Sequence, residues 1–557
     1  SLFIKLEDFL NNGKNFYKSF FFLVVFLCAV KLPSLLTSDI QPWDEGMYAA
    51  RVLSIHTYGD FIDQSSHSAG GFYSASHPPL LIWIGYFATL VFGVNSITLK
   101  LVIFIFSLLC VYLIMTLGKN LFSISAGFYA ALIFCSDIIF TVFSQRFQFD
   151  IPYTFFILLS FYLFFLYNDT QDFKYIILSG ISLGCCLMTK ILVGFYIPMV
   201  LFISFFLIRD KVNFRLKDIF ILTLTGVSIA APWHVYMIAQ YGSAFTDYFF
   251  KFHVYDRALQ GVEMNEKSSG IFYHVNYLLS IIPYSVLAFV SCLEYLKNIK
   301  SLSWQKIFML VWFITGLLIL TFFKTKLEAY ILMILVPGCF LIVQYIREIN
   351  NVKVNIKSVT IFVTIFNIIW FATEHIRPGM KLYISQSNKI FSAVIIAGLA
   401  LIFYFLSRFL ADKIELKKTY YIFILIFFFA INFYYLVRIP PWVNGFKLSG
   451  VKDYIDRSGN KKIIYVGSNS RFNPQFSYYF IEPDLNKTNP EYEFKFEDTK
   501  EGYEVIKDKL SNPVNKNFFI IVEKDQISRS VYDSSELFIP AESRLILKDT
   551  GYELYEN

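Results

Sequence analysis

Three carboxylates stand where apolar segments of this chain end. Asp44 and Glu45 come directly after the first long apolar run, and Asp150 follows a later one. Carboxylates at the ends of membrane segments are energetically costly and usually have a function. A carboxylate held at such a place can take a proton from a hydroxyl group, which is general-base chemistry. If the three acids share one side of a membrane, they define an active site at the lipid surface.

The composition indicates a polytopic membrane protein. Of 557 residues, 56% are hydrophobic, 19% aromatic and only 16% charged, whereas soluble domains have about 25% charged residues. Apolar stretches long enough for a ~30 Å hydrocarbon core recur through the first 440 positions. All seven cysteines lie before residue 340, so the polar tail has no disulfide framework, and no cysteine spacing is typical of a metal site.

The apolar pattern predicts about thirteen transmembrane helices, the first of which reads as a retained signal anchor. The run at 78–92 begins with two prolines and is short, so it predicts an interfacial helix within the first outer loop, 37–97. The thirteen predicted spans are 19–36, 98–118, 124–143, 151–168, 174–189, 191–208, 219–239, 273–293, 305–322, 328–346, 357–374, 390–409 and 420–438.

The distribution of basic residues gives the predicted orientation. Residues 1–440 hold 33 basic and 23 acidic residues, and this excess reports orientation and not nucleic-acid binding. With the N-terminus in the cytoplasm, the lysine and arginine clusters fall in inner loops. The residues that could do chemistry then share the outer face: Asp44, Glu45, His77, Asp150, His253, Arg257, Lys324, Lys326, Glu374 and Arg377.

The chain changes character near its end. From Gly450 onward it is charged and rich in turns, and runs such as 462–466, 518–522 and 544–547 predict short buried strands. Helical spacing recurs at 451–457 and 503–510. We therefore predict a transmembrane catalytic domain over 1–439 and a small soluble α/β domain over 440–557, on the same outer side.

Several motifs occur in a fixed order on the predicted outer face. They are Trp43-Asp44-Glu45-Gly46-Met47-Tyr48, Ser76-His77-Pro78-Pro79-Leu80, Phe92-Gly93-Val94 with Lys100-Leu101, Arg146 to Pro152, Leu187-Met188-Thr189-Lys190, Pro232-Trp233 with Phe249 to His253, and Lys324-Thr325-Lys326-Leu327 with Tyr330 and Pro337. In this order they resemble the polyprenyl-phosphate-sugar glycosyltransferases of the GT-C superfamily. The resemblance is greatest to the branch of the protein O-mannosyltransferases and the lipid A aminoarabinose transferase.

The chain departs from the family pattern at two neighbouring positions. The family has a lysine before its two prolines, and this chain has His77 there. Family members with a metal-binding loop have an acid where this chain has Ser76. The first departure leaves open which residue holds the donor phosphate, and the second weakens the case for a bound metal.

The resemblance implies a GT-C fold and an inverting transfer of a monosaccharide from a polyprenyl phosphate to an acceptor. The acceptor would be a hydroxyl or phosphate group on a periplasmic lipid, glycan or protein. Inversion needs one carboxylate to take the acceptor proton. We assign that role to Asp44, with Glu45 as the second acid of its motif and Asp150 orienting the acceptor or sharing the role. The alternatives are a helix cap for Asp44-Glu45 and a salt bridge to Arg146 for Asp150.

Five residues are expected to bind the donor phosphate. Arg257, Arg377, Lys324 and Lys326 suit charge-assisted contacts to phosphate, and snorkelling at a helix end is the alternative for each. His77 either donates a hydrogen bond to the phosphate or caps the helix after the two prolines. A phosphate-binding His77 would be sensitive to pH.

Three further residues are assigned by resemblance. Tyr48 and Tyr330 are expected to contact substrate, although interfacial tyrosine is common in membrane proteins. His253 is the residue through which a divalent metal would bind; a hydrogen-bonded structural histidine is the alternative. No cofactor is required by the expected reaction.

The rival functions are a transporter or flippase for a lipid-linked sugar, and a family member that only binds polyprenyl phosphate. A transporter would show two repeated halves with broken helices and charges near the bilayer midplane, which this sequence lacks. We expect a multi-pass protein of the bacterial inner membrane whose partners are the lipid-linked donor, a periplasmic acceptor and membrane lipid. The sequence identifies neither the sugar nor the acceptor, and it does not say whether the C-terminal domain covers the cavity or engages the acceptor.

Overall fold

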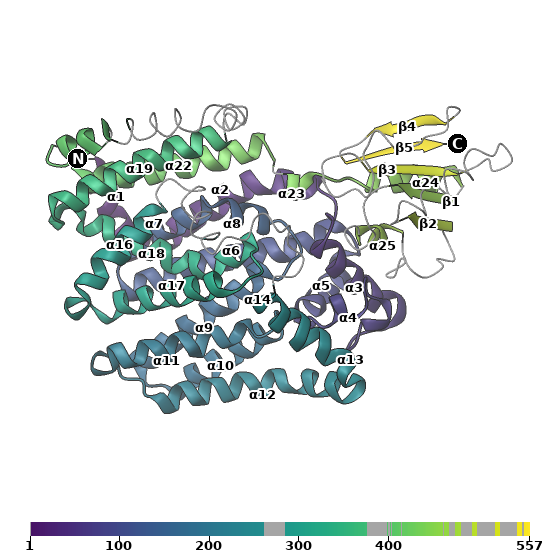
Figure 1. The fold of residues 1–557 in the computed structure, drawn as a ribbon, viewed down its shortest axis with the longest axis horizontal. Helices are drawn as coiled ribbons and strands as arrows, with labels where there is room; N and C mark the ends of the chain where they lie inside the picture. Colours follow the sequence, from purple (N-terminus) through teal and green to yellow (C-terminus); the bar gives the residue numbers. More distant parts are fainter. Residues whose placement is uncertain are drawn as a thin grey trace.

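A computed structural model of the protein describes helices through most of the chain and strands near its end (Figure 1). The described residues are 2–260, 274, 285–375, 398, 401–402, 404–413, 415–439, 441–459, 462–466, 474–480, 493–497, 518–523, 543–548 and 551–556.

Eight described helical segments are long and apolar enough to cross a membrane, and the chain is a multi-pass α-helical membrane protein as predicted. These segments are Gly13–Thr37 (with α2, Phe16–Thr37), Ser96–Leu121 (α6), Asp150–Thr170 (α9), Val193–Lys211 (with α11, Tyr196–Ile208), Leu216–Tyr241 (α12), Trp304–Phe322 (α17), Glu328–Asn351 (with α18, Leu332–Glu348) and Leu416–Val437 (α22). The total of thirteen stays a prediction, because most of 273–293 and of 390–409 lies outside the described residues.

Further helices complete the bundle. The predicted span 124–143 is two helices, α7 (Ile124–Cys135) and α8 (Ile138–Phe143), joined at Asp137, whose Oδ1 accepts a hydrogen bond from the Ile139 N–H at 2.7 Å. The others are α1 (Leu2–Asn11), α10 (Phe173–Leu187), α16 (Val286–Lys297) and α19 (Val354–His375).

The predicted first outer loop, 37–97, contains three α-helices. They are α3 (Asp44–Tyr58), α4 (Phe72–Ala75) and α5 (Leu80–Phe92). The 13 residues of α5 span about 20 Å at 1.5 Å per residue, too short for a crossing, in keeping with the predicted interfacial helix. A second outer segment, after α12, contains α13 (Ser243–Thr246), a π-helix (Asp247–Asp256) and α14 (Arg257–Leu259).

A five-stranded sheet forms the end of the chain. Its order is β2-β1-β3-β5-β4, with β1 parallel to β2 and β3, and β5 antiparallel to β3 and β4. The strands are β1 (Lys462–Val466), β2 (Glu493–Glu497), β3 (Phe519–Glu523), β4 (Arg544–Lys548) and β5 (Tyr552–Glu556), and the short helices before or among them are α23 (Pro441–Asn444), α24 (Ser449–Ser458) and α25 (Gln475–Tyr479). We call α24, α25 and the five strands the C-terminal unit.

Three strands and one helix of this unit match the sequence prediction. Strands β1, β3 and β4 lie where strands were predicted, and α24 covers the predicted helix 451–457. The prediction of a buried strand is wrong for β4, which forms an edge of the sheet and has only exposed or half-buried residues. The predicted helix at 503–510 lies outside the described residues.

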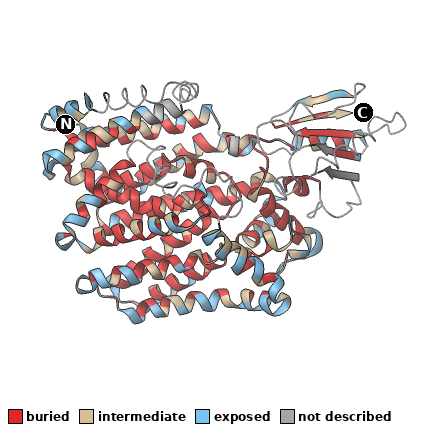
Figure 2. Cartoon of the chain, in the orientation of Figure 1, coloured by how far each residue is buried: buried red, intermediate tan, exposed pale blue. Residues whose placement is uncertain are grey.

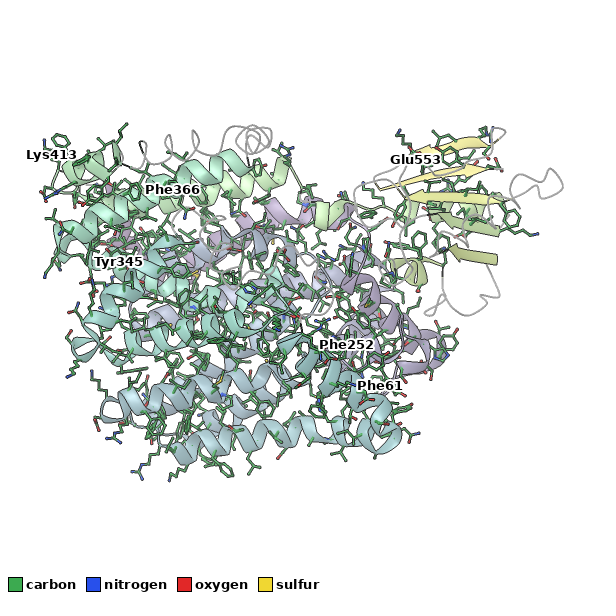
Figure 3. All side chains as sticks on the ribbon, in the orientation of Figure 1. Phe61, Phe252, Tyr345, Phe366, Lys413 and Glu553 are labelled. Atoms are coloured by element: carbon green, nitrogen blue, oxygen red, sulfur yellow. The ribbon has the colours of Figure 1, made fainter. Side chains whose placement is uncertain are left out.

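The elements from the outer loops gather at one end of the helical bundle. Figure 1 shows α3, α4, α5 and α13 at the end beside the C-terminal sheet. Phe61 and Phe252 mark this end in Figure 3, and Tyr345 lies toward the opposite one. Buried residues fill the middle of the bundle, while α12 presents an exposed outer face (Figure 2). The sheet and the outer-loop helices therefore lie on the same side of the bundle.

Helices α6 and α7 pack closely through two glycines. A Cβ atom added to Gly118 would lie 2.1 Å from the Cα of Gly127 and 2.4 Å from its backbone nitrogen. Small residues at helix contacts are typical of membrane bundles, because they let the backbones approach. This contact fixes the position of α6, and Lys100 lies near the N-terminus of that helix.

We predict that Gly118→Ala lowers the thermal unfolding temperature of the detergent-solubilised protein. The added methyl group meets backbone atoms that cannot rotate away, and overpacking of this kind destabilises by about 1–3 kcal/mol. Gly13→Ala is the matched control, because no atom lies within 4 Å of a Cβ at Gly13. Equal unfolding temperatures for the two variants would contradict the close packing of α6 on α7.

Candidate functional site

Asp44 is the first residue of α3, at the positive end of the helix. The preceding residue, Trp43, has a positive φ of 69°, a conformation rare for a residue with a side chain. Burial raises the pKa of the Asp44 carboxyl, and the nearby charge of Asp150 raises it further, while Arg257, Lys190 and Arg146 lower it. Burial is the largest of these effects, so the Asp44 pKa lies above the ordinary value of an aspartate.

Asp150 is the first residue of α9, and it is 5% exposed. Its carboxylate forms an ion pair with the Lys190 ammonium at 3.0 Å. The same ammonium lies 4.9 Å from the ring centre of Tyr153 and 5.0 Å from that of Tyr330, within the range of cation–π attraction. Lys190, in the turn after α10, thus joins three elements around Asp150.

The partner of Asp150 is a residue that sequence reasoning left without a role. The sequence placed Lys190 in a family motif and offered Arg146 as the salt-bridge partner. A lysine between two short apolar spans, out of place in the topology, was the available signal. Asp150 uses Lys190 as its ion-pair partner at 3.0 Å.

Glu45 points into the protein and not toward Asp44's surroundings. It is completely buried, and its carboxylate lies 3.1 Å from the Lys100 ammonium on α6. It also accepts hydrogen bonds from the backbone N–H of Phe147 at 2.8 Å and of Gln41 at 2.9 Å. Successive residues of a helix point about 100° apart, which is why Asp44 and Glu45 face different surroundings. These contacts favour a structural role for Glu45.

Arg146 supplies a second cation behind the acids. It is 4% exposed, and its Nη2 donates a hydrogen bond to the Pro42 carbonyl at 3.1 Å. Burial lowers the pKa of Arg146, and the charges of Glu45, Asp44 and Asp150 raise it. Arg146 therefore lies within electrostatic reach of all three predicted carboxylates.

His77 and His253 lie side by side although 176 positions separate them in the sequence. Their ring centres are 4.5 Å apart. The Nε2 atom of His253 is 3.0 Å from the Tyr73 carbonyl oxygen, and His77 packs edge-on against Phe149 at 5.3 Å. The Tyr48 ring packs on Phe149 at 4.0 Å, which brings Tyr48 to the same cluster.

The surroundings of His77 favour the neutral form of its imidazole. Burial lowers its pKa well below the ordinary value, and the nearby His253, Arg257, Arg51 and Lys190 lower it further. Its Nδ1 is buried and has no hydrogen-bond partner within the part of the chain that the structure describes. In its neutral form this histidine offers one N–H and carries no charge.

Arg51 holds the loop that carries His77. It is completely buried, and it donates hydrogen bonds to the carbonyl oxygens of Ser74 at 3.0 Å and His77 at 2.9 Å, and to Gln64 Oε1 at 2.9 Å. Sequence reasoning did not single it out. An arginine within the otherwise mostly apolar or small-residue stretch of α3 was the signal that could have found it.

Arg257 lies between the histidine pair and Tyr330. Its Nη1 donates a hydrogen bond to the Tyr330 hydroxyl at 3.4 Å. Its carbonyl accepts one from the Thr325 N–H at 2.9 Å, and the Ala258 carbonyl accepts one from Lys324, also at 2.9 Å. These backbone bonds bring the segment of Lys324 to the cluster, and the Lys324 side chain is exposed.

Lys326 is directed elsewhere. Its ammonium donates hydrogen bonds to the carbonyl oxygens of Leu320 and Thr321, each at 2.6 Å, at the C-terminus of α17. A cation at that end of a helix satisfies the last carbonyls, so this geometry favours the structural alternative for Lys326. The remaining predicted phosphate ligand, Arg377, lies outside the described residues.

The structure thus brings together seven of the predicted residues at the outer-loop end of the bundle, namely Asp44, Tyr48, His77, Asp150, His253, Arg257 and Tyr330. The carboxylates of Asp44 and Asp150 lie within electrostatic reach of one another and of the cations Arg257, Lys190 and Arg146. Among the residues that the structure describes, no group of three or more histidine, cysteine, aspartate or glutamate side chains could hold a metal ion. A metal at His253 stays a prediction.

Comparison with solved structures identifies the fold. The crystal structure of ArnT from Cupriavidus metallidurans bound to undecaprenyl phosphate matches with a TM-score of 0.62 at 13% identity, over 96% of each chain. The chain has the GT-C fold. The archaeal oligosaccharyltransferase AglB from Archaeoglobus fulgidus matches with a TM-score of 0.50 at 13% identity, over 92% of this chain and 69% of AglB.

Sequence comparisons agree with this GT-C fold and confirm the predicted resemblance. Residues 76–236 match the family model of dolichyl-phosphate-mannose-protein mannosyltransferase. The undecaprenyl phosphate-alpha-4-amino-4-deoxy-L-arabinose arabinosyl transferase of Wigglesworthia glossinidia brevipalpis is 25% identical over 51% of this chain and 51% of its own length. An uncharacterized protein of Aquifex aeolicus (strain VF5) is 24% identical over 56% of this chain and 61% of its own. The matches thus span about half to three fifths of these relatives.

We predict that Lys100→Met strongly destabilises the protein. The substitution leaves the Glu45 carboxylate buried without its cation, and breaking a buried ion pair in this way typically costs about 3–5 kcal/mol. The measurement is the unfolding temperature in detergent. Lys174→Met is the matched control, because the pair of Lys174 with Asp172 is solvent-exposed and exposed pairs contribute about 0–1 kcal/mol.

The double variant Glu45→Gln with Lys100→Met separates the lost pair from the lost packing. It should recover part of the unfolding temperature, because the unpaired buried charge is then gone. A Lys100→Met protein as stable as the Lys174→Met control would contradict the structural role of this pair.

Proposed function

We propose that this protein is an inverting glycosyltransferase that moves a monosaccharide from a polyprenyl phosphate to an acceptor hydroxyl. The observation that carries the proposal is the placement of the half-buried Asp44 carboxylate beside Asp150, within electrostatic reach of Arg257, Lys190 and Arg146. A base therefore lies near cations, and an inverting transfer in which a phosphate is the leaving group needs both. The GT-C fold and the undecaprenyl phosphate bound to ArnT support the choice of a polyprenyl carrier.

In the proposed reaction Asp44 takes the proton of the acceptor hydroxyl. The acceptor oxygen forms its bond to the anomeric carbon as the bond from that carbon to the phosphate oxygen breaks. The electron pair leaves with the phosphate, and the polyprenyl phosphate is released. Asp150 is already paired with Lys190, so we assign it the task of orienting the acceptor and of keeping Lys190 in place.

Arg257 is the proposed cation for the phosphate. It lies near both His77 and Asp44, and guanidinium groups suit phosphate oxygens. Lys324, exposed beside the same segment, is a second proposed contact. The neutral His77 would donate one hydrogen bond, and Tyr48 and Tyr330 would line the sugar or phosphate.

The proposed setting is the inner membrane of a bacterium with the N-terminus in the cytoplasm. The catalytic transmembrane domain would be 1–439 and the periplasmic domain 440–557. The names of the matched family and relative suggest mannose and 4-amino-4-deoxy-arabinose as the first sugars to test. The acceptor would be a periplasmic lipid, glycan or protein.

We predict that Asp44→Asn lowers kcat by about 10² or more, the size expected when a general base is lost. The assay uses purified protein, polyprenyl-phosphate sugars that include mannose and 4-amino-4-deoxy-arabinose, and total membrane extract as acceptor. Asp172→Asn is the matched control, because Asp172 pairs with Lys174 on the surface. Equal turnover by wild type and Asp44→Asn would contradict the role of Asp44.

The same assay separates the rival functions. Binding of polyprenyl phosphate by the wild type without transfer from any donor would favour a binding protein. Movement of the intact lipid-linked sugar across reconstituted membranes would favour a flippase.

We predict an acid limb in the pH profile of kcat that lies above the ordinary pKa of aspartate. A general base works only when it is ionised, and burial and Asp150 raise the pKa of Asp44, so activity is lost as pH falls through this raised value. Asp150→Asn removes the neighbouring negative charge and should move the acid limb of the residual activity to lower pH. A limb that stays in place or moves to higher pH would contradict the coupling of the two acids.

A further inference from the structure

The segment just before Asp44 is bound to the far end of the chain. Asp39 is 6% exposed, and its Oδ2 accepts hydrogen bonds from the backbone N–H groups of Leu448 at 2.7 Å and Ser449 at 2.8 Å. Leu448 is the residue before α24 and Ser449 is its first residue, and α24 belongs to the C-terminal unit. A carboxylate at the N-terminus of a helix is favourable, so Asp39 caps a helix more than 400 positions away.

Gln41 makes a second connection. It is 1% exposed; its Oε1 accepts hydrogen bonds from the N–H groups of Gly445 and Phe446, both at 3.1 Å, and its Nε2 donates to the Phe446 carbonyl at 3.0 Å. The Ile40 N–H donates to the Tyr479 hydroxyl at 2.8 Å, and Tyr479 is on α25. Residues 39–41 thus have hydrogen-bond partners from two parts of the C-terminal region.

The segment just after Asp44 touches the same unit. A Cβ atom at Gly46 would lie 2.5 Å from the backbone nitrogen of Gln475 and 3.0 Å from its Cα. Both are backbone atoms, so only a glycine allows α25 to lie this close to α3. Gly46 is two residues beyond Asp44, on the first turn of α3.

The backbone between these two contacts is strained. Trp43 has φ 69° and ψ −137°, a combination that residues with a side chain rarely adopt and that persists only when the surroundings determine it. The fixed segments on either side are 39–41 and Gly46. The C-terminal unit thus contacts the chain on both sides of the strained residue that sets the direction of α3.

We infer that the C-terminal unit, together with residues 445–448 that lead into it, is a positioning element of the active site, which holds Asp44 in place through Asp39, Gln41 and Gly46. The inference rests on the proposed function, since it assigns the unit a task in the same reaction. Asp44 remains the catalytic residue; Asp39, Gln41 and Gly46 act through it. Removal of one contact should let the first turn of α3 shift while the transmembrane bundle stays folded.

The test is the kcat and the donor KM of Gly46→Ala, with Gly13→Ala as control because a Cβ at Gly13 meets no atom within 4 Å. We expect kcat to fall by about 10- to 100-fold, since a misplacement of about 1 Å can reduce a rate about 100-fold, while the donor KM stays within about twofold of the wild type. In the Asp44→Asn background, Gly46→Ala should cause no further loss, because residues that act through one another are not additive. A general loss of fold would lower the activity of both backgrounds alike.

A second pair of variants tests the contact without adding bulk. Asp39→Ala removes both hydrogen bonds to α24 and should lower kcat as Gly46→Ala does. Asp39→Asn keeps one oxygen acceptor and should recover most of the activity. This pair decides the matter if Gly46→Ala does not give a monodisperse protein in detergent.

The outcomes separate the two proposals. Wild-type transfer together with an unchanged kcat for Gly46→Ala and Asp39→Ala would overturn the positioning role alone. An equal loss for Gly46→Ala in the wild-type and Asp44→Asn backgrounds would overturn it as well. A wild-type protein that transfers no sugar from any donor would overturn the proposed function, and the positioning role with it.

Discussion

The buried ion pair between Glu45 and Lys100 is the interaction on which the arrangement of the site depends. It joins α3, from the first outer loop, to the membrane-spanning helix α6. The same carboxylate binds the backbone N–H of Phe147, three residues before Asp150. One buried side chain therefore ties together the two segments that carry the proposed base and its neighbouring acid. The buried Glu45 carboxylate would be strongly unfavourable without the Lys100 cation. The ion pair therefore stabilises the packing of α3, α6 and the segment of Phe147 against one another.

Around this ion pair, several segments of the chain each supply residues of the proposed active site. The start of α3 supplies Asp44, the turn after α10 supplies the Lys190 partner of Asp150, and the segment at α14 supplies Arg257. The loop before α5 supplies His77, whose ring contacts that of His253. These groups come from several segments that lie far apart in the sequence. The site therefore requires that these segments keep a fixed arrangement relative to one another. The helical bundle and the C-terminal unit provide that arrangement.

The sequence was sufficient where the signal is local. Apolar length predicted a multi-pass membrane protein, and ordered motifs predicted the resemblance to GT-C enzymes, because these depend on residue type and order alone. It was insufficient where tertiary packing chooses a partner. Tertiary packing decides that the Glu45 side chain points inward. It also decides that the Lys326 side chain points toward the carbonyl groups at the end of α17. The contacts of residues 39–41 with α24 and α25 join positions more than 400 apart, for which one sequence contains no signal.

The central claim is that Asp44 acts as a base and not as a nucleophile, with Asp150 occupied by Lys190. Two neighbouring carboxylates could also support a double displacement through a covalent glycosyl-enzyme, which retains the configuration of the sugar. The most direct measurement is therefore the anomeric configuration of the product, determined by NMR against that of the polyprenyl-phosphate donor. Inversion is the result that this account predicts. Retention of the donor configuration would contradict it.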